Sequence, residues 1–133
     1  MCIRDSIKSG FRSYAEQVDT FQFWVNQHGL EMAKRESAPP GHSEHQMGTT
    51  ADLTCASVDW QLEEIFGSTP EAKWLAAHVH EFGFGLSYPQ NSEDVTGYVW
   101  EPWHVRYLGK ECAAAWQKSG MVLVKFLEAV AKA

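Results

Sequence analysis

The sequence has no long apolar run and few cysteines. None of its apolar stretches approaches the roughly eighteen residues that a membrane-spanning helix needs, so no membrane span is expected within this chain. The three cysteines, Cys2, Cys55 and Cys112, lie far apart and form no Cys-x-x-Cys pair. They therefore predict neither a disulfide framework nor a thiolate zinc site.

Positive charge is also scarce. Eleven Lys and Arg stand against seventeen Asp and Glu, which gives a net charge of −6, and the basic residues form no cluster. This balance argues against a nucleic-acid partner. The chain contains no Gly-rich phosphate loop, no G-x-S-x-G and no H-E-x-x-H, so the common signatures of nucleotide binding, serine hydrolysis and one large class of zinc peptidases are missing.

In length and composition the chain is typical of one folded domain. Its 133 residues are 44% hydrophobic, which is enough for a single core and too hydrophobic for a disordered chain. We therefore predict one domain over residues 1–133. The first five residues carry both charges and no apolar segment, so no signal peptide is visible there. The chain is thus either a compact cytosolic protein or a fragment that lacks its natural start.

Hydrophobic spacing predicts several helices and a few short strands. Ser13 and Glu16 form a capping-box pattern before a helix predicted over residues 14–35. Thr69 followed by Pro70 is typical of another helix start. Further helices are predicted over residues 110–118 and 121–132, and strands over residues 3–8, 51–55 and 95–103. Helices around short, irregular strands predict an α+β fold rather than a regular βαβ alternation.

The six histidines are the main candidates for chemistry. A catalytic zinc site needs three nitrogen or oxygen ligands and an open position for water. His45 and Asp52 are seven residues apart, which would place them on opposite faces of a strand or about 10 Å apart along a helix. Both reach one metal ion only if the chain folds back between them, and Gly48 permits such a turn. Surface or hydrogen-bonding roles are the alternative for both residues.

A second candidate is the segment EPWH, in which Glu101 and His104 lie three residues apart around a proline that restricts the backbone. His104 could bind a metal while Glu101 takes a proton from the metal-bound water. The alternative for Glu101 is a salt bridge to Arg106. A third candidate is Arg12, which could stabilise an oxyanion or could be a surface charge at a helix start.

Three segments, taken in order, carry a resemblance to a known family. They are SGFRSYAEQ, PGHSEHQMGTTAD and GYVWEPWHVRYLG. Together they resemble the VanY-type D-alanyl-D-alanine carboxypeptidases, a group of zinc peptidases that also includes L,D-carboxypeptidases of peptidoglycan. The resemblance covers about residues 7–130. It implies a fold shared with hedgehog-type zinc domains, in which helices flank a small antiparallel sheet.

The resemblance implies a zinc ion (Zn²⁺) as cofactor and names its ligands. His45 and Asp52 match the metal ligands of the family motif S-x-H-x-x-G-x-A-x-D, and His104 matches the third ligand in E-P-W-H. Zinc held in this way lowers the pKa of a bound water.

Catalytic and substrate-binding roles are implied in the same way. Glu101 matches the catalytic base, which accepts the proton of the water and passes it to the leaving amine. Arg12 matches the residue that polarises the scissile carbonyl and stabilises the oxyanion. Gln17 and Ser43 match positions that bind substrate in such enzymes.

The function implied is zinc-dependent removal of the C-terminal D-alanine from peptidoglycan stem peptides, as a D-Ala-D-Ala carboxypeptidase. An L,D-carboxypeptidase acting on tetrapeptide stems, a peptidoglycan endopeptidase and an inactive cell-wall binding module stay open as alternatives. The expected partner is a peptidoglycan stem peptide, and the chain is expected to be a monomer. Because peptidoglycan lies outside the cytoplasmic membrane, an extracytoplasmic location is expected.

Three departures from the family pattern stand out. Thr50 replaces an alanine beside the ligand segment, and Ser87 stands where relatives usually carry arginine before Tyr-Pro. The family also normally has a helix and further chain before the SGFRS segment, whereas few residues precede it here. We therefore expect the chain to lack an N-terminal part.

Overall fold

The computed structural model describes residues 5–132, so Cys2 and the first two residues of the strand predicted over residues 3–8 lie outside the described residues. The rest of that predicted strand falls within β1 (Asp5–Ser9). None of the helices in the described part of the chain is long and apolar enough to cross a membrane.

Within residues 5–132, four strands form one antiparallel sheet in the order β1-β2-β4-β3. The central strand β2 (Thr50–Cys55) pairs with β1 on one side and with β4 (His104–Tyr107) on the other, and β3 (Phe84–Leu86) pairs with the far edge of β4. The predicted α+β fold, with a small antiparallel sheet and flanking helices, is confirmed.

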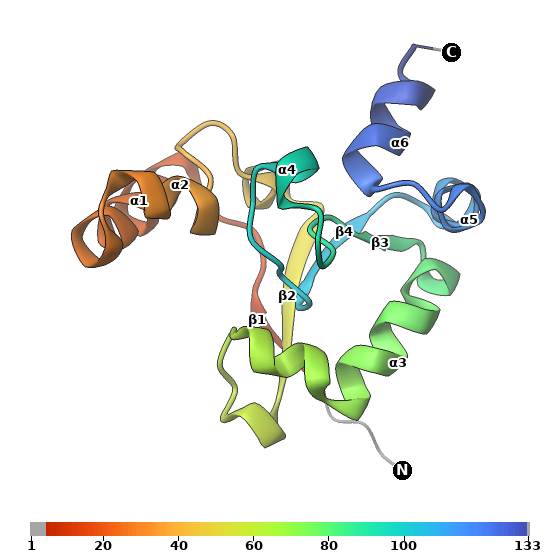
Figure 1. Ribbon diagram of the computed structural model, residues 1–133, viewed down its shortest axis with the longest axis horizontal. Coiled ribbons are helices and arrows are strands. Elements are labelled where there is room, and N and C mark those ends of the chain that lie inside the picture. The colour runs from red at the N-terminus through yellow and green to blue at the C-terminus, as the bar shows by residue number, and fades with distance from the viewer. Residues whose placement is uncertain (1–4, 133) are drawn as a thin grey trace.

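Helices lie on two sides of this sheet (Figure 1). The pair α1 (Tyr14–His28) and α2 (Leu30–Glu36) lies on one side, drawn at the left. The helices α3 (Pro70–His78), α5 (Lys110–Ser119) and α6 (Leu123–Val130) lie on the other side, drawn at the right. The helices α1 and α2, between β1 and β2 in the chain, therefore lie on one side of the sheet, and α3, α5 and α6, which follow β2 in the chain, lie on the other.

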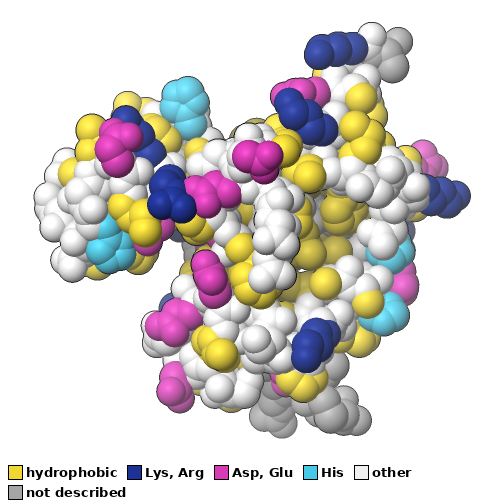
Figure 2. Space-filling model, viewed as in Figure 1, with side chains coloured by type: hydrophobic (Ala, Val, Ile, Leu, Met, Phe, Trp, Pro, Cys, Tyr) yellow, Lys and Arg dark blue, Asp and Glu magenta, His cyan; other side chains and the backbone are white. Residues whose placement is uncertain are grey.

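The main hydrophobic core lies between the sheet and α3. This helix begins as its sequence predicts, because the Thr69 side chain accepts a hydrogen bond from the Ala72 amide and Pro70 occupies the first turn. Figure 2 shows hydrophobic side chains in the hollow between α3 and α6. The buried members of the core come from both strands and helices and are Cys55, Val58, Phe66, Ala72, Leu75, Val79 and Val105.

The prediction of a single helix over residues 14–35 is wrong, because the chain forms two helices, α1 and α2, that meet at Gly29. The backbone of Gly29 has φ 81° and ψ 163°, a positive-φ extended conformation that glycine adopts without strain. Its amide closes α1 by donating to the Val25 carbonyl, and its carbonyl accepts from the Ala33 amide in α2. The predicted capping box at the start of α1 is confirmed, since Ser13 and Glu16 cap each other reciprocally.

The strand predicted over residues 95–103 is also wrong. A short helix, α4 (Glu93–Thr96), ends at Gly97 with φ 80°, and the chain then runs as a loop until β4 begins at His104. Pro102 cannot donate a ladder hydrogen bond, which explains why pairing starts only after it. The loop is anchored by backbone hydrogen bonds from Val99 to the Arg35 carbonyl and from Glu101 to the Tyr88 carbonyl.

Candidate metal centre and active site

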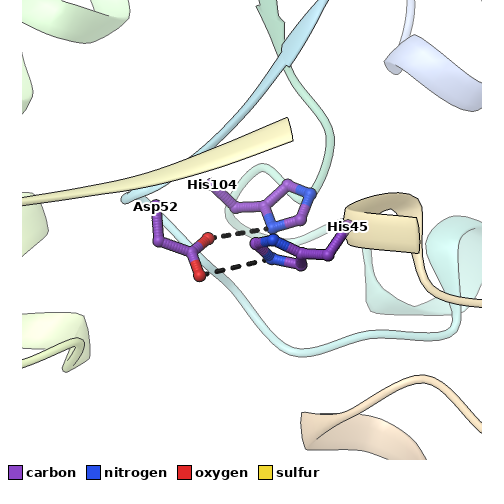
Figure 3. A group of neighbouring side chains, drawn as sticks. All are labelled: His45, Asp52 and His104. Carbon is purple, nitrogen blue, oxygen red and sulfur yellow. Dashed lines mark ion pairs between the residues drawn. The ribbon is translucent and has the colours of Figure 1, made fainter. Parts of the chain in front are cut away.

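Three buried side chains from separate elements meet in one cluster (Figure 3). His45 belongs to the short 3₁₀ helix η1 (Glu44–Met47), Asp52 to β2 and His104 to β4, and one ligand atom of each lies within 4.8 Å of the others. The Asp52 carboxylate faces both rings from one side, with Oδ2 3.2 Å from His45 Nε2 and Oδ1 3.2 Å from His104 Nδ1. A carboxylate and two imidazoles thus converge on one point.

The fold explains how residues far apart in the sequence meet. Asp52 and His104 are direct partners in the antiparallel pairing of β2 with β4. His45 reaches them because the chain turns back at Gly48, whose left-handed backbone (φ 70°) closes η1 immediately before β2. The fold-back that the His45 and Asp52 spacing requires is therefore present at the predicted glycine.

The orientation of His45 is set by the segment that precedes α1. Its Nδ1 lies 2.7 Å from the carbonyl oxygen of Gly10, and the Arg12 amide donates to the His45 carbonyl at 3.2 Å. With Nδ1–H donating to that carbonyl, the lone pair of Nε2 faces Asp52. The SGFRS segment and the ligand segment are thereby held together.

Charges in the cluster perturb one another. Burial acts to raise the pKa of Asp52, but its contacts with His104 and His45 outweigh burial and lower the pKa to about 2. For His104, burial acts to lower the pKa, whereas the carboxylates of Asp52 and Glu44 raise it to about 9. Without a metal ion the cluster therefore holds a proton on His104 at neutral pH.

These three groups fit a zinc ion. Asp52 Oδ1 is buried and makes no well-directed hydrogen bond within the described residues, and its contact with His104 Nδ1 is 3.2 Å long, so both atoms can face a common cation instead. Two imidazole nitrogens and one carboxylate oxygen are also a ligand set that catalytic zinc takes.

Glu101 lies beside the cluster. Its Oε2 is 3.4 Å from His104 Nδ1, and its side chain is 11% exposed. Burial, together with the negative charges of Asp52 and Glu44, raises its pKa to about 8, although His104 acts in the opposite direction. The alternative of a salt bridge to Arg106 is wrong, since Arg106 pairs with Glu44 and no ion pair joins it to Glu101 among the described residues.

The other predicted residues form a connected group next to the cluster. Arg12 Nη1 donates to Gln17 Oε1 at 2.9 Å, and Nη2 donates to Ser9 Oγ at 3.1 Å. Gln17 is fully buried and uses its amide nitrogen to donate to the Ala38 carbonyl at 2.7 Å. Ser43 Oγ accepts from the His45 amide at 3.3 Å. Gln17 therefore fixes Arg12, and Ser43 caps the helix that carries His45.

One cavity of about 580 Å³ joins these groups. All seven predicted site residues line it: Arg12, Gln17, Ser43, His45, Asp52, Glu101 and His104. Aromatic side chains of Trp24 and Trp103 form part of its wall. The arrangement offers a metal position, an adjacent carboxylate and a fixed guanidinium inside one opening.

Sequence reasoning missed two residues at the site. Glu44 accepts a hydrogen bond from His104 Nε2 at 2.9 Å, and the Tyr88 ring lies against His104 with centroids 4.7 Å apart. Burial raises the pKa of the Tyr88 hydroxyl, so it stays protonated. Glu44 is adjacent to His45 in the motif, which was the one available signal, but the sequence does not show which side chain it faces.

The fold and the cluster together define a site suited to metal-assisted hydrolysis. Residues 2–110 match the family described as VanY, D-alanyl-D-alanine carboxypeptidase. The match covers most of the chain, so the chain belongs to the VanY family.

Individual relatives agree with this assignment. The chain is 42% identical to the putative carboxypeptidase YodJ of Bacillus subtilis (strain 168) over 93% of its own length, and spans 45% of that protein. It resembles the structure of the LdcB LD-carboxypeptidase with 40% identity and a TM-score of 0.86, covering 95% of this chain and 59% of that one. It also resembles the D,D-pentapeptidase VanY E175A mutant in complex with Zn(II), with 27% identity and a TM-score of 0.80 over 94% of this chain and 72% of that one.

Proposed function

We propose that this chain is a zinc-dependent carboxypeptidase that removes the C-terminal D-alanine from peptidoglycan stem peptides. The observation that carries the proposal is the buried His45, Asp52 and His104 cluster with Glu101 beside it, in a chain of the VanY family. In this proposal the three cluster residues hold the zinc ion. When bound, zinc supplies a water of lowered pKa and a positive charge for the substrate carbonyl.

Glu101 is the proposed general base. Its carboxylate lies 3.4 Å from a proposed ligand nitrogen, within reach of a water at the metal position. Glu101 accepts the proton of that water as it attacks the peptide carbonyl, and then donates it to the leaving amine of D-alanine. Burial raises the pKa of Glu101 in the metal-free protein, which makes its carboxylate form a stronger proton acceptor than an exposed glutamate.

Arg12 is the proposed oxyanion stabiliser. Gln17 and Ser9 hold its guanidinium in place, so its charge needs little rearrangement during the reaction. Gln17 and Ser43 line the same cavity and are proposed substrate contacts.

Two bonds are candidates for the one that is cut, the D-Ala-D-Ala bond and the L,D bond of a tetrapeptide stem. The description of the family favours a D-Ala-D-Ala bond. The higher identity to the LdcB LD-carboxypeptidase, 40% against 27% for the D,D-pentapeptidase, favours the L,D bond of a tetrapeptide stem. Either substrate lies outside the cytoplasmic membrane, so the proposed enzyme acts there.

A product assay on defined stem peptides tests the proposal. The protein is incubated with a pentapeptide stem or a tetrapeptide stem, with and without a chelator, and zinc is then restored. We expect free D-alanine from one of the two stems, its loss on chelation and its return with zinc.

Other products would contradict the proposal. New internal peptide ends would indicate an endopeptidase, and zinc binding without any product would indicate a binding module. D-alanine release that survives complete removal of metal would overturn the zinc mechanism.

A further inference from the structure

Glu44 has three polar contacts and no role in the proposed reaction. Its Oε2 accepts hydrogen bonds from His104 Nε2 at 2.9 Å and from Ser87 Oγ at 2.7 Å. Its Oε1 accepts a hydrogen bond from Arg106 Nη1 at 2.7 Å. These partners come from β4 and from the residue after β3, so Glu44 ties η1 to the far half of the sheet.

The two histidines of the cluster use opposite ring nitrogens. His45 faces Asp52 with Nε2 and contacts the Gly10 carbonyl with Nδ1. His104 faces Asp52 with Nδ1 and contacts Glu44 with Nε2. An imidazole that binds a metal through one nitrogen must carry its proton on the other, and an acceptor at that second nitrogen fixes this tautomer.

A carboxylate is a stronger acceptor than a backbone carbonyl, so the contact with Glu44 favours a proton on Nε2 of His104. The negative charge of Glu44 is partly buried, and the guanidinium of Arg106 compensates it. The hydroxyl of Ser87 satisfies the oxygen that also accepts from His104. Ser87 thus has a function at the position where the family pattern departs.

We propose that Glu44 is a positioning residue that holds His104 in the tautomer that binds metal, and that Arg106 and Ser87 hold Glu44 in place. This inference rests on the proposed zinc site. It assigns Glu44 no contact with the substrate.

Zinc affinity of Glu44→Gln tests the inference. The amide keeps the size of the side chain but is a weaker acceptor, and its NH₂ group can donate to Nε2 and favour the wrong tautomer. Competition with a chelator is expected to show zinc affinity about 10- to 100-fold below that of the wild type. The matched control is Glu31→Gln, which removes an exposed carboxylate paired with Lys34 and should bind zinc as the wild type does.

A spectroscopic measurement separates positioning from a general structural role. In the zinc-loaded wild type, nitrogen-15 shifts of His104 should show a protonated Nε2 and a metal-bound Nδ1. In Glu44→Gln the Nε2–H signal should move and exchange faster with water, while the His45 signals stay unchanged.

A milder variant covers the case in which Glu44→Gln does not fold. Ser87→Ala removes one of the three hydrogen bonds to Glu44, so its zinc affinity should fall in the same direction by a smaller factor. Wild-type zinc affinity in Glu44→Gln, or in Ser87→Ala if that is the variant available, would overturn the inference. A wild type that binds no zinc would instead overturn the proposed function.

Discussion

Glu101 combines burial with a position next to the proposed metal ligands. If it is the general base, replacing it with an amide removes proton transfer and leaves the ligands intact. We expect Glu101→Gln to lower kcat by about 10²- to 10⁴-fold. Zinc content, measured on the same sample, should stay at the wild-type level.

The matched control for this change is Glu111→Gln on the exposed face of α5. It should retain wild-type kcat. Wild-type turnover in Glu101→Gln would remove Glu101 from the mechanism, and loss of zinc would give it a role in metal binding instead.

Arg12 is the second residue whose role can be isolated. Its guanidinium is held by Gln17 and Ser9 and lines the cavity that contains the cluster. Removing one such stabilising group typically costs about 10²- to 10³-fold in kcat. We expect a loss of this size in Arg12→Ala, measured by steady-state kinetics with saturating zinc.

Lys118→Ala, which removes an exposed cation from α5, serves as its control and should leave the kinetics unchanged. An effect of Arg12→Ala on KM alone would assign Arg12 to substrate binding. If Arg12→Ala changes neither kcat nor KM, Arg12 is a surface charge without a role in the reaction.

For individual residues, the motifs predicted which side chains would meet in the site. Sequence spacing explains only some of the contacts between them. The turn at Gly48 was foreseeable because two ligands seven residues apart need a fold-back. The contact between Glu44 and His104 was not, since it spans 60 positions and depends on how β4 lies against η1. Pairwise contacts of this kind are set by tertiary packing, which spacing does not encode.

Among the elements, helix starts were predicted better than strands. Ser13 and Thr69 cap their helices through contacts within a few residues, so the sequence contains the whole signal. The aromatic stretch before His104 has high β-propensity, yet it forms a loop in which the Trp100 ring packs against Gly67. There tertiary contacts override local preference.

That packing gives a prediction for the loop that carries Glu101. A Cβ added at Gly67 would lie 2.3 Å from two ring carbons of Trp100 and 3.3 Å from Cβ of Pro102. The tryptophan and the proline flank Glu101, so Gly67→Ala must move the loop. Overpacking of this kind costs about 1–3 kcal/mol. We expect a lower free energy of unfolding, measured with denaturant, together with reduced turnover.

Ser68→Ala is the appropriate comparison, because it changes the exposed neighbouring residue and adds no atoms. It should match the wild type in both measurements. Gly67→Ala with full stability and full turnover would show that the loop adapts without moving Glu101.

For the whole molecule, the sheet order brings the buried charges together at its centre. β2 and β4 are adjacent, and they carry Asp52 and His104 at paired positions. Glu101 precedes β4, and Glu44 lies in η1 just before β2. Two histidines and three carboxylates therefore share one interior region, so the stability of the fold must depend on what neutralises them.

Because these buried groups gain or lose protons when the protein folds, the stability of the metal-free protein should depend on pH. The pKa of His104 rises from 6.5 to about 9 on folding, because the carboxylates of Asp52 and Glu44 outweigh burial. Its stabilising contribution is present below pH 6.5 and is lost as the pH rises through 9. Burial raises the pKa of Glu101 from 4.5 to about 8, so folding becomes less favourable as the pH rises from 4.5 through 8, a range that overlaps the one set by His104.

In the presence of a chelator, we therefore expect the free energy of unfolding to fall as the pH rises from 6.5 to 9. Bound zinc should restore stability, by about 2.7 kcal/mol when free zinc is 100-fold above its dissociation constant. At one fixed concentration of free zinc the gain should be larger at high pH, where zinc no longer competes with the proton on His104. Thermal and urea unfolding across this range, with chelator or with zinc, measure both effects. A chelated protein whose stability is constant or rises over this range would contradict the raised pKa values, because protons bound only in the folded state must destabilise it when they leave.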